Sequence, residues 1–199
     1  ETRSFDNAAE TVGSYLPTGR MWMYKRFIIA GLSCCALCCV SAFGQANKMA
    51  GSMGNDQSFV DFAGQTDMLE AHFGQMAQDQ AGKQDVKDYG QMLTTDHTND
   101  YNQLTAAASK AGDTVPKGID AMGNRMIRPF EKSKGSRFDH RFLHEMITGH
   151  EQAIKKYKAE IQNGKSDDIK TYAQQALPTL EKHLQDAKAL EAGKPMPTS

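Results

Sequence analysis

Residues 137–160 read RFDHRFLHEMITGHEQAIKKYKAE. Apolar side chains recur in this stretch at steps of three and four residues, at Phe138, Phe142, Met146, Ile154 and Tyr157. This period predicts an amphipathic helix over residues 137–163, because residues three or four apart share one face of a helix. His150 falls in the middle of that apolar stripe. A ring buried there needs a hydrogen-bond partner or a metal ion.

Three more segments have the same helical period, over residues 56–81, 84–111 and 167–191. Glycine follows the apolar stripe at Gly82 and at Gly112, which is a typical place for a helix to end. No segment has the two-residue period of a strand. The sequence therefore predicts an all-α protein built as a four-helix bundle over residues 56–192.

A long connector over residues 112–136 separates the second and third predicted helices and is rich in glycine and proline. We expect a short helix near residues 119–127. The connector is long enough to span the length of a helix, so a crossover of the ferritin type is possible. A plain up-and-down bundle is equally compatible with this length.

One polar residue lies on or beside the apolar stripe of each predicted helix: Glu70, His97, His150 and His183. At about 1.5 Å of rise per residue, the first three lie at the same height within about 5 Å. His183 is about one turn away, and Pro178 in its helix is expected to introduce a kink. The four residues are therefore predicted to form one buried belt. Either a hydrogen-bonded network without metal or a single metal ion would satisfy the polar groups of this belt.

Asp100 lies three residues after His97 on the same stripe, and could join the belt or orient a histidine ring. Asp139 is near the start of its helix, where a cap or local hydrogen-bond partner is expected. Among the remaining histidines, His72 lies off the apolar stripe of its helix. His140 and His144 are four residues apart, a spacing that can chelate a metal, but they lie well off their apolar stripe and are expected to be a solvated pair.

Three imidazoles and one carboxylate would form a nitrogen-rich site that suits zinc, copper, iron or nickel. The chain contains no Glu-x-x-His motif, which argues against a di-iron centre of the ferritin type. No Ser or Cys stands in a recognisable nucleophile motif. The sequence therefore favours metal binding without catalysis, or an interaction protein whose polar belt is structural.

Residues 21–46 resemble a secretory signal, with Lys25 and Arg26 before an apolar run over residues 27–40 and small residues at its end. Cleavage is expected near Asn47, which predicts a periplasmic or secreted protein. The alternative is an uncleaved membrane anchor. All four cysteines (Cys34, Cys35, Cys38 and Cys39) lie in this run and would be removed with it. Residues 1–20 are expected to be translated upstream sequence. Residues 47–55 are expected to form a flexible leader, and residues 193–199 a loose tail.

Charge gives no case for nucleic-acid binding. The chain has 23 basic and 24 acidic residues, and four of the basic and three of the acidic ones lie in residues 1–46, which leaves a net charge of −2 for the remainder. A protein that binds nucleic acid through its backbone phosphates needs a basic surface. Contact with a membrane is expected only through an uncleaved signal. The sequence does not indicate a protein partner.

Four stretches resemble a bacterial family known as domain of unknown function 4142: FVDFAGQTDMLEAHFGQMA (59–77), TTDHTNDYNQL (94–104), the stretch at 137–160, and ALPTLEKHLQDAKAL (176–190). The resemblance covers nearly all of residues 58–191 in order. It implies an exported protein with a ferritin-like fold and functional interest in Glu70, Asp96, His97, Asp139, His150 and His183. The family has no established activity.

Overall fold

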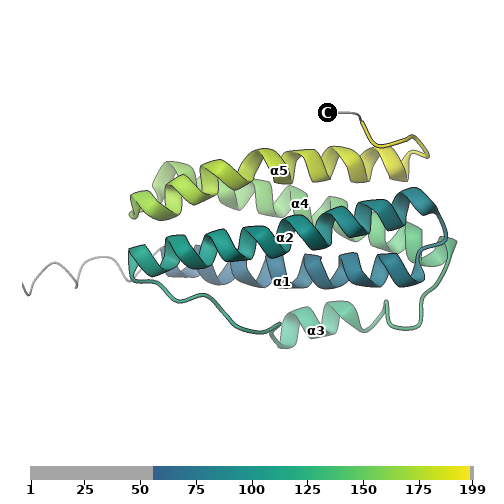
Figure 1. The fold of residues 1–199 in the computed structure, drawn as a ribbon, viewed down its shortest axis with the longest axis horizontal. Helices are drawn as coiled ribbons and strands as arrows, with labels where there is room; N and C mark the ends of the chain where they lie inside the picture. The colour runs from purple at the N-terminus through teal and green to yellow at the C-terminus, as the bar shows by residue number, and fades with distance from the viewer. Residues whose placement is uncertain (1–55, 198–199) are drawn as a thin grey trace, which may run out of the picture. The chain divides into compact units, whose positions relative to one another are not determined.

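Five helices form the described part of the chain, residues 56–197, in the computed structural model (Figure 1). The long helices are α1 (Asp56–Gln80), α2 (Gln84–Ala111), α4 (Ser136–Asn163) and α5 (Asp167–Glu191), and the short one is α3 (Ala121–Ile127). The predicted all-helical class is confirmed, and residues 56–197 contain no strand, only an isolated bridge between Ala81 and Gly135. There are five helices rather than four because the connector contains the expected short helix. Expectations about the signal and leader concern residues outside the described range.

Local capping explains where several helices begin and end. Gly112 ends α2 in the left-handed conformation with φ of 83°, which a residue without a Cβ adopts at little cost. Asp120 begins α3 by accepting a hydrogen bond from the backbone N–H of Gly123 at 2.7 Å. Ser166 begins α5 in the same way, because its side chain accepts a hydrogen bond from the backbone N–H of Ile169. These residue types satisfy N–H groups that have no partner within the helix.

The connector between α2 and α4 is a crossover, which decides between the two topologies that its length allows. Asp139 in the first turn of α4 accepts hydrogen bonds from the N–H groups of Gly82 and Lys83, at the turn between α1 and α2. At the opposite end of α1, Asp56 accepts hydrogen bonds from the N–H groups of Lys165 and Ser166, just before α5. Thus α2 and α4 begin at the same end and run parallel, while the connector returns along the length of the helices (Figure 1).

Two apolar clusters occupy the interior. One contains Phe73, Leu93 and Phe142, and the other contains Phe59, Leu104, Tyr157 and Ile169. Along each long helix, the residues of one cluster come before the polar belt residue and those of the other come after it. The belt is therefore a polar layer between two apolar layers. None of the described helices combines the length and the apolar character that a membrane-spanning helix requires.

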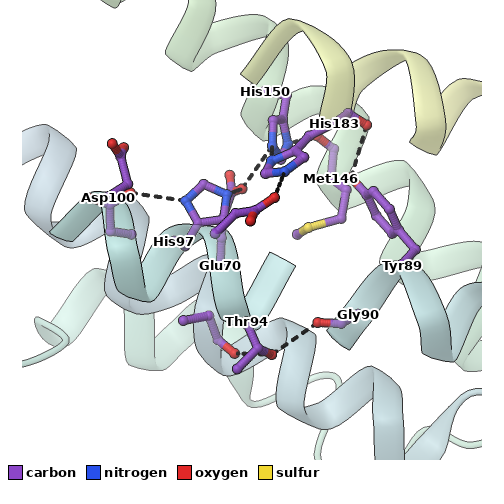
Figure 2. Close-up of polar contacts among 12 residues, drawn as sticks. Glu70, Tyr89, Gly90, Thr94, His97, Asp100, Met146, His150 and His183 are labelled. Atoms are coloured by element: carbon purple, nitrogen blue, oxygen red, sulfur yellow. Dashed lines mark hydrogen bonds and ion pairs between the residues drawn. The ribbon is translucent and has the colours of Figure 1, made fainter. Parts of the chain in front are cut away.

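Helices α1 and α2 approach closely at a pair of glycines. A Cβ atom added to Gly74 would lie 2.5 Å from the carbonyl oxygen of Gly90, and one added to Gly90 would lie 2.7 Å from the carbonyl oxygen of Gly74. The Thr94 hydroxyl donates to that Gly90 carbonyl at 3.0 Å (Figure 2). Side chains on α1 and α2 near this contact therefore need little length to reach one another.

Candidate metal centre

The four belt residues meet in the interior, one from each long helix. His97, His150 and His183 are at most 1% exposed and Glu70 is 4% exposed, which confirms the predicted burial. Figure 2 shows the three rings turned toward one another around the Glu70 carboxylate. The centres of neighbouring rings lie 5.2–5.7 Å apart. His183 belongs to the same group although its position along α5 suggested an offset of one turn.

The Glu70 carboxylate contacts two of the rings through one oxygen. Its Oε2 lies 2.8 Å from Nε2 of His97 and 3.1 Å from Nε2 of His150. Both contacts are at ion-pair distance. Apart from these ion-pair contacts, Glu70 Oε2 and His97 Nε2 have no hydrogen-bond partner in the described part of the chain. Such atoms are uncommon and call for an explanation.

The other nitrogen of each ring points away from this group and has an acceptor of its own. Nδ1 of His97 lies 2.9 Å from Oδ1 of Asp67, and Nδ1 of His150 lies 2.8 Å from the carbonyl oxygen of Met146. Nε2 of His183 lies 2.9 Å from Oδ2 of Asp96. A carbonyl or carboxylate oxygen accepts, so the outward nitrogen of each ring carries the proton.

This pattern fixes which atoms remain inside. A neutral imidazole has one N–H donor and one acceptor nitrogen, so the inward nitrogen of a neutral ring is an acceptor when its outward nitrogen is protonated. Nε2 of His150 then faces two other acceptors, Oε2 of Glu70 at 3.1 Å and Nδ1 of His183 at 3.3 Å. Acceptors that converge in this way require a proton or a cation between them.

Neighbouring charges adjust the pKa values of His97 and Glu70 in opposite directions. Burial lowers the pKa of His97, but the carboxylates of Glu70 and Asp67 outweigh burial and raise it to about 10. Burial raises the pKa of Glu70, but the charges of His150 and His97 outweigh burial and lower it to about 2. Without a metal, these two side chains therefore form a buried ion pair at neutral pH.

Burial dominates the pKa values of two neighbouring groups. It lowers the pKa of His150 to about 4, against the attraction of Glu70, so this ring is neutral at pH 7. It raises the pKa of Asp67 to about 7, against the hydrogen bond from His97. The half-exposed Asp96 behaves differently, because its hydrogen bond with His183 lowers its pKa despite partial burial. Neutral His150 is in the protonation state that a metal ligand requires.

Asp96, Asp100 and Asp139 lie in different places relative to the cluster. Asp96 contacts His183 directly, as described above. Asp100 accepts a hydrogen bond from the Tyr172 hydroxyl at 2.8 Å, and Tyr172 in turn bonds the Tyr157 hydroxyl at 2.9 Å. Asp139 caps the start of α2 and lies 11 residues before His150, about three turns of α4 away from the cluster.

Asp67 is a further buried side chain at the cluster, one that the helical period did not single out. It is 1% exposed and holds the His97 ring from the side opposite Glu70. Asp67 lies three residues before Glu70 and so shares its helix face, which is a signal in the sequence. Spacing alone does not separate it from Thr66, which belongs to the apolar stripe. The Met146 carbonyl is a backbone group, and no residue type would have revealed it.

The remaining histidines are separate from the cluster. His140 and His144 are exposed on α4, and His72 is half-buried on α1. The expectation of solvent exposure is thus confirmed for the pair on α4. These two residues provide natural controls, because they belong to the same chain and have the same side chain but no contact with the cluster.

The inward atoms fit a small metal ion. One nitrogen from each of the three rings lies within 4.8 Å of the other two. In a tetrahedral zinc site with bonds of about 2.0–2.1 Å, ligand atoms are about 3.3 Å apart, which lies within the range of distances here. A cavity of about 200 Å³ between α2 and α5 reaches the cluster from solvent, with Asp96, His97 and His183 among its lining residues.

Comparison with known proteins identifies a family without assigning an activity. The family described as "Domain of unknown function (DUF4142)" matches residues 40–190. No curated protein and no solved structure matches the chain. The matched region includes all five helices except the last residue of α5, and with them every residue of the cluster. The chain therefore belongs to the family of domain of unknown function DUF4142.

Proposed function

We propose that this protein binds one metal ion through Glu70, His97, His150 and His183. The observation that carries this proposal is the environment of His150 Nε2, which faces Glu70 Oε2 at 3.1 Å and His183 Nδ1 at 3.3 Å. Its own proton is on Nδ1, toward the Met146 carbonyl. A metal ion would satisfy these inward acceptors together, while the outward acceptors orient the rings as is usual for metal-bound histidine.

The proposed ligand set contains three nitrogens and one oxygen, and it suits zinc, copper, iron or nickel. A mononuclear site is favoured, because a di-iron centre uses additional carboxylates and Glu-x-x-His motifs. Binding would displace the proton from His97 Nε2. Affinity is therefore expected to increase with pH, because the metal competes with a proton for the same nitrogen.

The metal proposal is tested by analysing the full chain with Cys34, Cys35, Cys38 and Cys39 replaced by Ser, so that no thiolate contributes. We expect zinc, copper, iron or nickel to raise the melting temperature, because an ion that binds only the folded state stabilises it. His97→Ala and His150→Ala are expected to abolish both metal content and this rise. His140→Ala and His144→Ala are the matched controls and should retain both.

A structural role for the cluster is the second candidate, in a non-catalytic envelope or stress-related interaction protein. Its support is the position of the His97 ring between two carboxylates, at 2.9 Å from Asp67 and 2.8 Å from Glu70. A protonated His97 would form ion pairs with both without any metal. If the protein purifies without metal and none of the four metals changes its melting temperature, this second candidate replaces the first.

We also propose that the fold is a ferritin-like four-helix bundle, with α3 as an addition in the crossover. The antiparallel pairs α1–α2 and α4–α5, joined by a long crossover, support this assignment. Export to the periplasm or out of the cell is proposed from the signal-like residues 21–46.

Export makes a separate prediction about the mature chain. Protein isolated from its native host is expected to begin near Asn47 and to lack all four cysteines, because signal peptidase cleaves after small residues such as Ala46. Intact-mass spectrometry measures this directly. An intact mass that includes residues 34–39 would instead indicate an uncleaved anchor.

A further inference from the structure

Another depression reaches the cluster from the side opposite to the α2–α5 cavity. It has a volume of about 220 Å³ and lies between α1, α3 and α4. Its walls are mainly apolar and include Leu69 and Phe73 of α1. Of the four belt residues, Glu70 alone lines it. We call this depression the methionine pocket, after Met122, Met126 and Met146, which also line it.

The pocket extends to the cluster because α4 has a glycine at the contact. A Cβ atom at Gly149 would lie 3.2 Å from Oε1 of Glu70, so a larger side chain there would fill the space beside the carboxylate. The other oxygen, Oε2, faces His97 and His150. A single carboxylate thus has one oxygen in the cluster and the other on the side of Gly149 and the pocket.

The three thioethers lie at successive depths. Met122 is 59% exposed, Met126 is half-buried, and Met146 is 1% exposed. Among the residues that the structure describes, Met122 is the large hydrophobic side chain that is exposed. Met122 and Met126 are four residues apart on α3 and so share one face. Met146 is one turn before His150, whose ring bonds its carbonyl oxygen, and Figure 2 shows it beside the cluster.

The charge of the lining suits a cation. Its ionisable residues are Glu70, Asp120 and Glu145, and no lysine, arginine or histidine lines the pocket. The apolar walls would not replace the tightly held water of a divalent ion. Thioether sulfur, in contrast, is a soft ligand that selects Cu(I) over zinc, magnesium or calcium.

We propose that the methionine pocket takes up Cu(I) and that Met122, Met126 and Met146 lead it from solvent to the histidine cluster. Thioether binding stands on the pocket alone, while delivery to the cluster rests on the proposed function. The pocket and the α2–α5 cavity would then admit different ions. The polar α2–α5 cavity, lined by Asp96 and Asp100, suits a hydrated divalent ion.

The test measures how fast the full chain takes up Cu(I), again with all four cysteines replaced by Ser. Cu(I) is supplied without oxygen as its complex with bicinchoninate, and loss of the colour of that complex is followed by stopped flow. The double variant M122L/M126L keeps apolar packing but removes two thioethers. It is expected to take up Cu(I) about tenfold more slowly, with an unchanged zinc uptake rate.

Met92→Leu is the matched control. Met92 is half-buried and, like Met126, packs against the apolar cluster that contains Phe73, but it does not line the pocket. It should take up Cu(I) at the wild-type rate. Unchanged Cu(I) uptake in M122L/M126L would overturn the proposal. Equal slowing of Cu(I) and zinc would also overturn it, because the effect would then come from altered packing.

His97→Ala separates this proposal from the metal-centre proposal. If only the metal centre is wrong, His97→Ala leaves the final amount of bound copper unchanged, while M122L/M126L still slows Cu(I) uptake. If only the pocket is wrong, His97→Ala reduces the bound copper and M122L/M126L has the wild-type rate. Circular dichroism on each variant verifies that its helices are intact.

Discussion

Glu70→Gln is expected to lower the free energy of unfolding of the metal-free protein by about 3–5 kcal/mol, because it breaks a buried ion pair by removing one partner. Glutamine preserves the size of the side chain but removes the charge that faces His97 at 2.8 Å and His150 at 3.1 Å. Burial would then oppose the imidazolium of His97 without the compensation of Glu70. Urea denaturation at pH 7 with a metal chelator, followed by far-UV circular dichroism, measures the loss.

Glu151→Gln is the matched control for this substitution. Glu151 has the same side chain on α4 and an ion pair with Lys188 at 2.7 Å, but its side chain is 53% exposed. Exposed ion pairs contribute about 0–1 kcal/mol, so the control should unfold close to the wild-type urea concentration. An equally small loss of unfolding free energy in both variants would show that the buried ion pair contributes no more to stability than a surface ion pair.

The free energy of unfolding of the metal-free protein is expected to fall by about 3 kcal/mol between pH 7 and 9.5. The pKa of His97 is raised from 6.5 to about 10 in the folded protein. Over this interval the folded state keeps a proton that the unfolded state has lost, so stability decreases as pH rises. Asp67, with a pKa of about 7, makes a smaller contribution in the same direction.

The measurement is a series of urea denaturation curves from pH 7 to 9.5, with chelator present. The range stops below the pKa of about 10 for tyrosine and lysine in an unfolded chain, whose ionisation would add a separate effect. His97→Ala should remove most of the dependence, and His140→Ala should leave it unchanged. A wild-type stability that is constant or rises over this range would contradict the raised pKa of His97.

The helices were predictable because their pattern is local. Apolar residues at steps of three and four follow from the geometry of one helix, and glycines mark ends such as Gly112. The bounds of the long helices differ from the predicted ones by at most one residue, and the short helix lies within the expected residues 119–127. Placing Glu70, His97 and His150 near one level needed only the rise per residue, which put His183 about one turn away.

The direction of the connector was not predictable from its length. It depends on contacts between residues far apart in the chain, such as Asp56 with the backbone of Lys165 and Asp139 with that of Gly82. The sequence contains these aspartates but not their partners. Each partner is a backbone N–H, which every residue except proline has, so residue type provides no signal for it.

What the sequence by itself determined is an all-helical chain with one polar residue on the buried face of each long helix. Only the tertiary structure decided which ring nitrogens face one another. Rotation and sliding of neighbouring helices depend on packing between them, for example at Gly74 and Gly90. The proton positions depend on Asp67, Asp96 and the Met146 carbonyl, which bond the outward nitrogens. Helical period fixes the face on which a side chain lies, whereas its partners are fixed by the helices that pack against that face.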